Sequence, residues 1–297
     1  MTDHDTAAGA APKPYLQLQG VRKSFGVGGA STLALAHVDL SVREGEFLAI
    51  VGPSGCGKST LLQIAAGLMP PSAGHVRFDG RAVTAPPEGI VYLFQQYGKS
   101  LFPWRTVLQN VSFATENRPG MTRDQRHAHS MKHVAMVGLE GFANHYPWQL
   151  SGGMQQRVTI ARALAAEPRV LLMDEPFSSV DALTRLELHA MVLDLWEKHR
   201  FTAVLVTHDV DEAVFLADRI AVLSGRPSTV VGVLDTELPR PRDSITTKEL
   251  PRFLELRHEL LSRLLGRPTG AIPGSVSGEI PGAVPGAIPG TLPAAAP

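Results

Sequence analysis

The stretch "GPSGCGKST" at residues 52–60 constrains the fold of this 297-residue chain more than any other feature. It fits the pattern G-x-x-x-x-G-K-[ST], and it stands between the apolar run "EFLAIV" and the helix-like segment "KSTLLQIAAGL". An unbroken apolar run is typical of a strand that is buried on both faces of a sheet. A chance glycine-rich turn is the alternative interpretation, but a preceding strand and a following helix are the context that this motif requires.

The glycine-rich turn has the chemistry of a phosphate site. Its glycines let successive backbone N–H groups point at phosphate oxygens, and the N-terminus of the next helix adds partial positive charge. We expect the Lys58 ammonium to reach the β- and γ-phosphates of a nucleotide and the Ser59 hydroxyl to ligate Mg²⁺. The predicted phosphate-loop residues are Gly52, Pro53, Ser54, Gly55, Cys56, Gly57, Lys58, Ser59 and Thr60.

Apolar runs of strand length alternate with helix-like segments over much of the chain. The runs "RVLLMDE" and "TAVLVTHD" predict buried strands, and "YLQLQGV" and "LALAHVDLSV" have the two-residue period of half-buried strands. Helices are predicted in "QQRVTIARALAAE", "ALTRLELHAMVLDLWEKH" and "DEAVFLADRI". Buried strands that alternate with helices indicate an α/β fold with a mostly parallel sheet.

Charge and composition narrow the class of protein. Lysine and arginine together number 28, as do aspartate and glutamate, so the net charge is zero and argues against a nucleic-acid binder with a basic surface. The single cysteine cannot form an internal disulfide, unlike the cysteines of stapled secreted domains. The first 15 residues lack the apolar core of a signal peptide, and no apolar run approaches the roughly 18 residues of a membrane span. We therefore expect a cytoplasmic protein whose membrane role, if any, is peripheral.

The C-terminal residues 268–297 are rich in proline, glycine and alanine. Four prolines, Pro281, Pro285, Pro289 and Pro293, recur every four residues, whereas a collagen helix has a period of three. We predict an extended, mobile tail without a packed core, and a docking segment is the alternative.

Polar side chains follow two of the predicted buried strands. Asp174 and Glu175 end the run "RVLLMDE", and His208 ends the run "TAVLVTHD". A carboxylate at this place is where a Walker-B aspartate holds Mg²⁺, so Asp174 is the predicted metal ligand. Glu175 is the predicted general base for the attacking water, and His208 is expected to sense or polarise the γ-phosphate. A solvated acidic turn and a structural histidine are the alternatives.

Three further histidines, His127, His129 and His133, lie close together in "RHAHSMKH". His129 and His133 have the i,i+4 spacing that could bind a metal, but the sequence offers neither a third ligand nor an acidic base nearby. A solvated helix face is the simpler interpretation.

A second glycine-rich helix start occurs at "LSGGMQQR", residues 150–157. Ser151, Gly152 and Gly153 begin a predicted helix whose first N–H groups are donors for an anion. No catalytic side chain stands beside them.

The order of phosphate loop, LSGG, Asp-Glu and strand-end histidine resembles the ATP-binding subunit of an ABC transporter. The resemblance covers about residues 15–245 and implies an N-terminal antiparallel β subdomain and a helical subdomain at about 97–160. It implies that Phe25 in "RKSF" stacks on adenine, and that Gln95 in "LFQQ" touches Mg²⁺ and the attacking water. "SSVD" matches the D-loop, with Asp181 at its end, although the family more often has Ala-Leu at its centre. The remaining predicted parts are a disordered leader at 1–14, a C-terminal helix at 246–267 and the tail at 268–297.

The resemblance also implies cofactors and partners. ATP and Mg²⁺ are the expected cofactors, and two copies are expected to sandwich each ATP between the phosphate loop of one and the Ser151 helix start of the other. Two transmembrane permease subunits and, indirectly, an extracytoplasmic substrate-binding protein are the other expected partners, without nucleic acid. The expected location is the cytoplasmic face of the inner membrane.

The flanking segments suggest the transported solute. "SLFPWRTVLQNV", "DALTRLE", "FTAVLVTHDV" and "PRPR" resemble importers for nitrate, taurine and aliphatic sulfonates, with the sulfonate branch most similar. Nitrate and taurine are the alternatives within this type. A soluble ABC ATPase of DNA repair or translation is the alternative from another class, but such proteins usually show a coiled-coil insertion or two cassettes, and this chain shows one cassette without sustained heptads.

Overall fold

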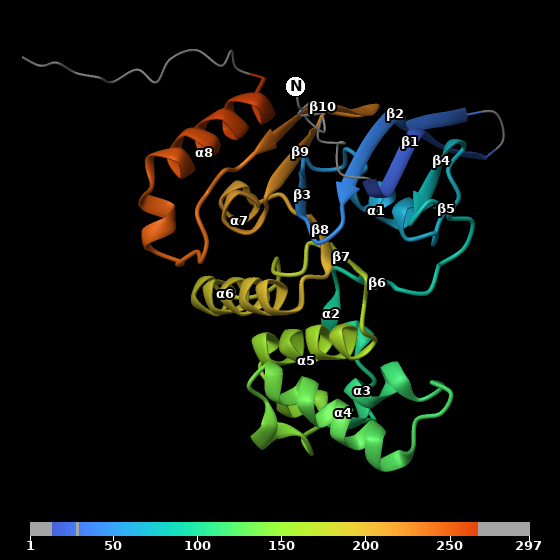
Figure 1. Cartoon of the computed structure of the whole chain (residues 1–297). Coiled ribbons are helices and arrows are strands. Elements are labelled where there is room, and N and C mark those ends of the chain that lie inside the picture. Colours follow the sequence, from blue (N-terminus) through green and yellow to red (C-terminus); the bar gives the residue numbers. More distant parts are fainter. Residues whose placement is uncertain (1–13, 28–29, 267–297) are drawn as a thin grey trace, which may run out of the picture.

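The computed structural model describes residues 14–27 and 30–266, and these residues contain ten strands in one mixed sheet (Figure 1). The predicted leader and tail lie outside the described residues, apart from Pro14, which begins the first strand. The strands are β1 (Pro14–Val27), β2 (Ala30–Arg43), β3 (Phe47–Val51), β4 (Ala73–Phe78), β5 (Arg81–Ala82), β6 (Ile90–Leu93), β7 (Val170–Asp174), β8 (Thr202–Val206), β9 (Arg219–Leu223) and β10 (Ser228–Asp235).

The sheet has a parallel half and an antiparallel half. Its strand order is β5-β4-β1-β2-β10-β9-β3-β8-β7-β6, and the run from β9 to β6 pairs entirely in parallel. β1 pairs antiparallel with β2 and β4, and β4 pairs antiparallel with β5. β10 joins the halves, because it pairs antiparallel with β9 and parallel with β2. The predicted fold class, a phosphate-loop core with an antiparallel N-terminal part, is confirmed.

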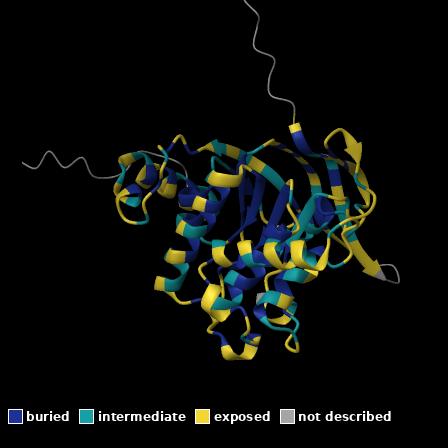
Figure 2. Ribbon diagram, turned by 60° about the horizontal axis from the view of Figure 1, so that its bottom comes forward, coloured by how far each residue is buried: buried dark blue, intermediate teal, exposed yellow. Residues whose placement is uncertain are grey.

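Helices cover both faces of the parallel half. The α-helices of the described residues are α1 (Lys58–Ala65), α2 (Tyr97–Ser100), α3 (Val107–Ser112), α4 (Arg123–Met136), α5 (Gly152–Ala165), α6 (Ala182–His199), α7 (Val210–Leu216) and α8 (Pro251–Leu264). α1 lies on one face and α6 and α7 lie on the other. Alternate side chains of a strand point to opposite faces. Phe47 and Ala49 of β3 accordingly pack in one core cluster with residues of α6 and α7, whereas Leu48 and Ile50 pack in another with residues of α1. Figure 2 shows buried residues in the interior of the molecule and exposed residues on the outer sides of the helices.

The helices α3, α4 and α5 pack on one another below the sheet in Figure 1 and form the helical part of the molecule. α4 begins at a capping box in which Thr122 and Gln125 satisfy each other's backbone N–H groups. α5 (Gly152–Ala165) follows its N-cap Ser151, and its last residues, 161–165, lie beyond the range of about 97–160 expected from the sequence. The second glycine-rich helix start therefore opens the helix that connects this part to β7.

One predicted helix is wrong over its second half. "DEAVFLADRI" was expected to be helical throughout, but α7 ends at Leu216, and Arg219 begins β9. Ala217 has an extended backbone, and the Asp218 carboxylate accepts the Phe47 N–H at 3.0 Å. Because β9 pairs in parallel with the buried β3, tertiary pairing overrides the local helical pattern there.

The C-terminal helix is also shorter than expected. Residues Thr246–Glu249 form a 3₁₀ turn, Leu250 is extended, and α8 starts at Pro251. A residue before proline is disfavoured in the helical conformation, which separates the turn from the helix. Within the described ranges, no helix is both long enough and apolar enough to cross a membrane.

Candidate active site

A cavity of about 560 Å³ lies at the phosphate loop. The loop supplies one wall, and the ends of β7 and β8, together with two more distant segments, supply the rest. The residues that line it are Ser54, Gly55, Gly57, Lys58, Ser59, Thr60, Gln95, Glu175, His208 and Arg226.

The phosphate loop is built so that only glycine fits at its end. Gly57 has a φ of 109°, and a Cβ there would lie 3.0 Å from Leu35 Cδ2. Gly57 is also the N-cap of α1 and provides no side chain to cap the helix, so the first N–H groups of α1 are available to a ligand. The buried Lys58 ammonium donates to the carbonyls of Gly52 and Pro53 at 2.8 and 3.1 Å. The loop thus presents backbone donors and one lysine to the same space.

The Cys56 side chain points away from this space. It is buried in the core, and a Cβ on Gly52 would lie 2.9 Å from its Sγ atom. Its carbonyl accepts a hydrogen bond from the Ser228 hydroxyl. Cys56 can therefore face a ligand only through its backbone.

Asp174 ends β7 beside the loop and binds two hydroxyl groups. The Ser59 hydroxyl donates to Oδ1 and the Tyr92 hydroxyl donates to Oδ2, each at 2.9 Å. Burial raises the pKa of the Asp174 carboxyl, while these two hydrogen bonds oppose that rise. Ser59 and Asp174 together form an oxygen donor set that suits Mg²⁺. Tyr92 was not predicted as a site residue, because the only indication in the sequence is one hydroxyl-bearing side chain within the strand "IVYL".

The three residues predicted to be catalytic meet at one carboxylate. Gln95 Nε2 donates to Glu175 Oε2 at 2.9 Å, and His208 Nδ1 lies 3.2 Å from the same oxygen. Glu175 has a φ of 44°, which is uncommon for a residue other than glycine, and its N–H is fixed by the Val206 carbonyl at 2.9 Å. Backbone strain of this kind is concentrated at functional sites.

The predicted nucleotide-binding residues outside the phosphate loop do not line this cavity. Ser151 is the N-cap of α5, and its hydroxyl accepts the Met154 N–H at 3.3 Å, so one of the expected free donors is already satisfied. Asp181 caps α6 through the Thr184 N–H at 3.0 Å, and this bond lowers the pKa of the Asp181 carboxyl. Gly152 and Gly153 form the first turn of α5.

Phe25 lies in β1 with 43% of its surface exposed, and it does not line the phosphate cavity either. The Lys23 ammonium is 5.3 Å from the centre of its ring. Its exposed face is compatible with the predicted stacking on adenine, which stays a prediction.

The histidines of α4 make ordinary helix contacts. His129 Nε2 lies 2.9 Å from the Ala165 carbonyl, and His133 Nδ1 lies 2.8 Å from the His129 carbonyl. His127 is exposed. In the part of the chain that the structure describes, no group of three or more His, Cys, Asp or Glu residues is placed to hold a metal ion.

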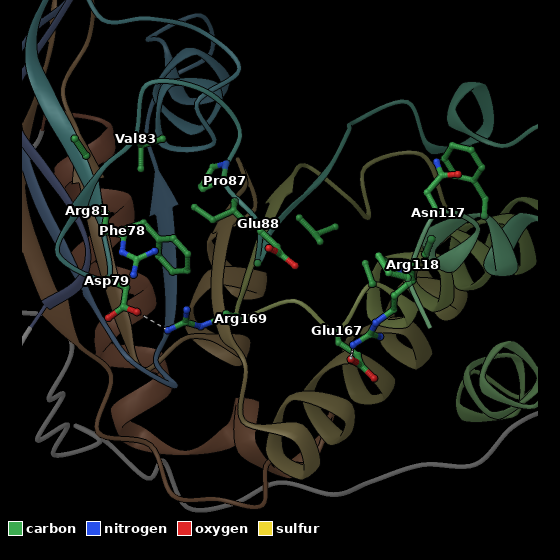
Figure 3. Close-up of a pocket in the computed structure, with 18 residues that line it drawn as sticks. Phe78, Asp79, Arg81, Val83, Pro87, Glu88, Asn117, Arg118, Glu167 and Arg169 are labelled. Atoms are coloured by element: carbon green, nitrogen blue, oxygen red, sulfur yellow. Dashed lines mark hydrogen bonds and ion pairs between the residues drawn. The ribbon is translucent and has the colours of Figure 1, made fainter. Parts of the chain in front are cut away.

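Two larger cavities lie between the sheet and the helical part. One of about 920 Å³ has the Asp79–Arg169 ion pair on one wall and the Arg118–Glu167 ion pair on the other, at 2.7 and 2.6 Å (Figure 3). The second, of about 610 Å³, shares part of this lining and continues to Phe94 and Gln96, beside Gln95. Neither cavity contains the phosphate loop or Glu175, so their size does not mark the reacting centre.

A phosphate loop between the buried strand β3 and the helix α1, with carboxylates at the end of β7, which β8 separates from β3, defines a phosphate-loop NTPase. Residues 35–178 also match the family model described as ABC transporter. An uncharacterized ABC transporter ATP-binding protein of Methanocaldococcus jannaschii is 47% identical over 250 residues, covering 84% of this chain and 91% of that protein. The chain therefore belongs to the family of ABC transporter ATP-binding proteins and carries its ATP-hydrolysing cassette.

Two relatives bear the name of a transported solute. The nitrate import ATP-binding protein NrtC of Synechococcus elongatus is 43% identical over 84% of this chain and 38% of that relative. The bicarbonate transport ATP-binding protein CmpC of the same species is 44% identical over 83% of this chain and 37% of that relative. Among solved structures, the dimeric ATP-binding cassette MJ0796 bound to ADP and Pi is similar with a TM-score of 0.66 and 36% identity, covering 74% of this chain and 98% of that chain.

Proposed function

We propose that this chain is the ATP-hydrolysing subunit of an importer for a small anion and that the 560 Å³ cavity is its catalytic centre. The observation that carries the proposal is the meeting of Gln95 and His208 on Glu175 Oε2 beside the phosphate loop. A carboxylate held in this way can accept a proton from a water that attacks the γ-phosphate.

The proposed roles follow from the contacts in the cavity. The Lys58 ammonium, now bound to two carbonyls, would exchange them for the more strongly charged phosphate oxygens. Ser59 and Asp174 would hold Mg²⁺, whose charge offsets that of the phosphates. Glu175 would take the proton of the attacking water, while Gln95 and His208 orient that water and the γ-phosphate.

We propose that the active form is a dimer. Ser151 and Asp181 lie outside the phosphate cavity of their own chain, so each needs a second copy to meet a nucleotide. A two-fold interface would pair each phosphate loop with the partner's Ser151 helix start and produce two equivalent sites. The dimeric state of the similar cassette MJ0796 supports this arrangement.

Permease subunits are the proposed partners at the groove that starts next to Gln95. The cavity there is lined by Phe94 and Phe102, and Trp104 nearby has 70% of its surface exposed. Exposed aromatic residues beside a polar rim suit a protein interface. We place the dimer on the cytoplasmic face of the inner membrane, bound peripherally to two permease subunits that receive the solute from a binding protein.

The proposed solute is a small anion. Relatives named for nitrate and bicarbonate support this class, while the aliphatic sulfonate expected from the flanking segments stays a prediction, with nitrate or taurine as alternatives. The test is the ATPase rate of the reconstituted importer with nitrate, bicarbonate, taurine or an alkanesulfonate on its binding protein. Stimulation by a neutral solute alone would refute the anion class.

Glu175→Gln tests the catalytic centre and the dimer together. We expect this variant to hydrolyse ATP at least about 100-fold more slowly, because a general base is lost, and to elute as a dimer with Mg-ATP. Adding Ser151→Arg should leave ATP binding to the monomer nearly intact but abolish dimerisation and hydrolysis. His127→Arg, on the exposed face of α4, is the control for an added cation.

The outcomes separate the two assignments. Wild-type turnover in the Glu175→Gln variant would show that Glu175 is not the base. Loss of ATP binding to the monomer on adding Ser151→Arg would show that Ser151 binds the nucleotide of its own chain.

A further inference from the structure

Arg226 lines the phosphate cavity together with Lys58, Glu175 and His208. It lies in the turn between β9 and β10, far in sequence from every other residue that lines the cavity except His208. Its guanidinium is exposed, and among the described residues it has no ion pair, hydrogen bond or ring contact. The turn therefore presents an unpaired, permanently charged group to the phosphate loop.

The turn that carries Arg226 is fastened to the phosphate loop. The buried Ser228 hydroxyl donates to the Cys56 carbonyl, and its oxygen also lies 3.2 Å from the Ser224 carbonyl. Ser224 and Thr229 close the turn, because the Ser224 N–H donates to the Thr229 carbonyl and the Thr229 N–H donates to the Ser224 hydroxyl, both at 2.9 Å.

The strand before the turn packs on the start of the same loop. A Cβ on Gly52 would lie 3.1 Å from Leu223 Cβ and 3.2 Å from the Leu223 carbonyl oxygen. β9 and the phosphate loop are thus in close contact on one side of the turn, and Ser228 joins them on the other. These contacts hold the backbone of the turn that carries Arg226 against the loop.

We propose that Arg226 is an additional nucleotide-binding residue that contacts the terminal phosphate of ATP. This inference depends on the proposed nucleotide site. Gln95, Glu175 and His208 belong to the reacting end of that site, and Arg226 lines the same cavity as they do. A guanidinium presents a planar fork of donors that matches two phosphate oxygens, and its charge offsets that of the triphosphate.

Binding constants of Arg226→Ala and Arg226→Lys test the proposal. Titration calorimetry with Mg-ATP and Mg-ADP is done on both variants and on Arg77→Ala, an exposed arginine on β4 that lies outside the cavity. Because the alanine variant loses a charge-assisted hydrogen bond, Arg226→Ala should weaken ATP binding about tenfold or more. ADP, which lacks the terminal phosphate, should lose much less, and Arg226→Lys should lie between wild type and Arg226→Ala.

Each outcome decides the matter. Equal ATP affinity in Arg226→Ala and Arg77→Ala would show that Arg226 is only a solvated charge, and an equal loss for ATP and ADP would exclude the terminal phosphate. Lys58→Ala checks the site on which the inference depends, because unchanged ATP binding in that variant would refute the phosphate cavity itself. The melting temperature of each variant confirms that a lost affinity is not a lost fold.

Discussion

Substitution of Gly153 by alanine should force apart two helices that carry different parts of the site. A Cβ at this position would lie 2.3 Å from Thr184 Cγ2, whereas carbon atoms in contact prefer about 3.5–4.0 Å. Thr184 cannot easily turn away, because a β-branched side chain in a helix has few χ1 rotamers. Its N–H is moreover fixed by the Asp181 carboxylate.

Overpacking of this kind costs about 1–3 kcal/mol, and alanine gains at most about 1 kcal/mol in helix propensity, which offsets only part of that cost. Thr184→Ser removes the offending methyl group. The next atoms, Thr184 Cβ and Oγ1, lie 3.6 and 3.8 Å from the added Cβ, which is ordinary contact. We therefore expect Gly153→Ala alone to lower the free energy of unfolding by about 1–2 kcal/mol and Thr184→Ser to restore most of that loss.

Urea unfolding followed by circular dichroism measures the free energy of unfolding of the wild type, the two single variants and the double variant. ATP hydrolysis should recover with stability in the double variant, because the added methyl group points at α6. If Gly153→Ala destabilises the protein equally with threonine or serine at position 184, the steric reasoning is wrong. Recovery of stability without ATP hydrolysis would refute the inference that the methyl group acts only through α6.

Two further substitutions test buried charges. Asp174→Asn should abolish hydrolysis yet raise the free energy of unfolding at pH 8, since the buried carboxylate is charged there and the amide is not. The Asp174 pKa is raised in the fold, so the carboxylate weakens the protein as pH rises through that pKa; urea midpoints that differ equally at pH 4 and 8 would contradict this. Arg242→Lys should destabilise by about 2 kcal/mol, because one ammonium cannot replace a guanidinium whose Nη1 donates to the Phe215 and Ala217 carbonyls at 2.8 and 2.9 Å. Thermal unfolding of this variant is compared with that of the exposed-site control Arg257→Lys, and equal melting temperatures would refute the role of Arg242.

Arg242 belongs to a motif whose structural role could not be predicted from the sequence. The segment "PRPR" was used only as a family resemblance. In the fold, the Arg242 guanidinium is buried against the end of α7, and burial lowers its pKa to about 10. Arg240 pairs with Asp218 at 2.7 Å and lies over the Trp196 ring at 4.3 Å. These partners are 20 or more residues away, and no local pattern indicates them.

The sequence alone determined the features that depend on neighbouring residues. A buried strand, a glycine-rich turn and a helix start in direct succession predict the phosphate loop, and the strand and helix periods predict the α/β class. Asp174, Glu175 and His208 were found in the same way, because each stands at the end of an apolar run of strand length. These features can be predicted without a structure, since each depends on a few consecutive residues.

Tertiary structure decided everything that depends on which segments become neighbours. The Tyr92–Asp174 and Gln95–Glu175 hydrogen bonds join residues 82 and 80 positions apart, and the Ser228–Cys56 bond spans 172. The segment "RIAVL" forms the strand β9 because it pairs in parallel with the buried strand β3. Strand order and register arise from burial summed over distant segments, which the local pattern of hydrophobic residues does not encode. Arg226 belongs to the candidate site for the same reason, because only the pairing of β9 and β10 beside the phosphate loop brings it there.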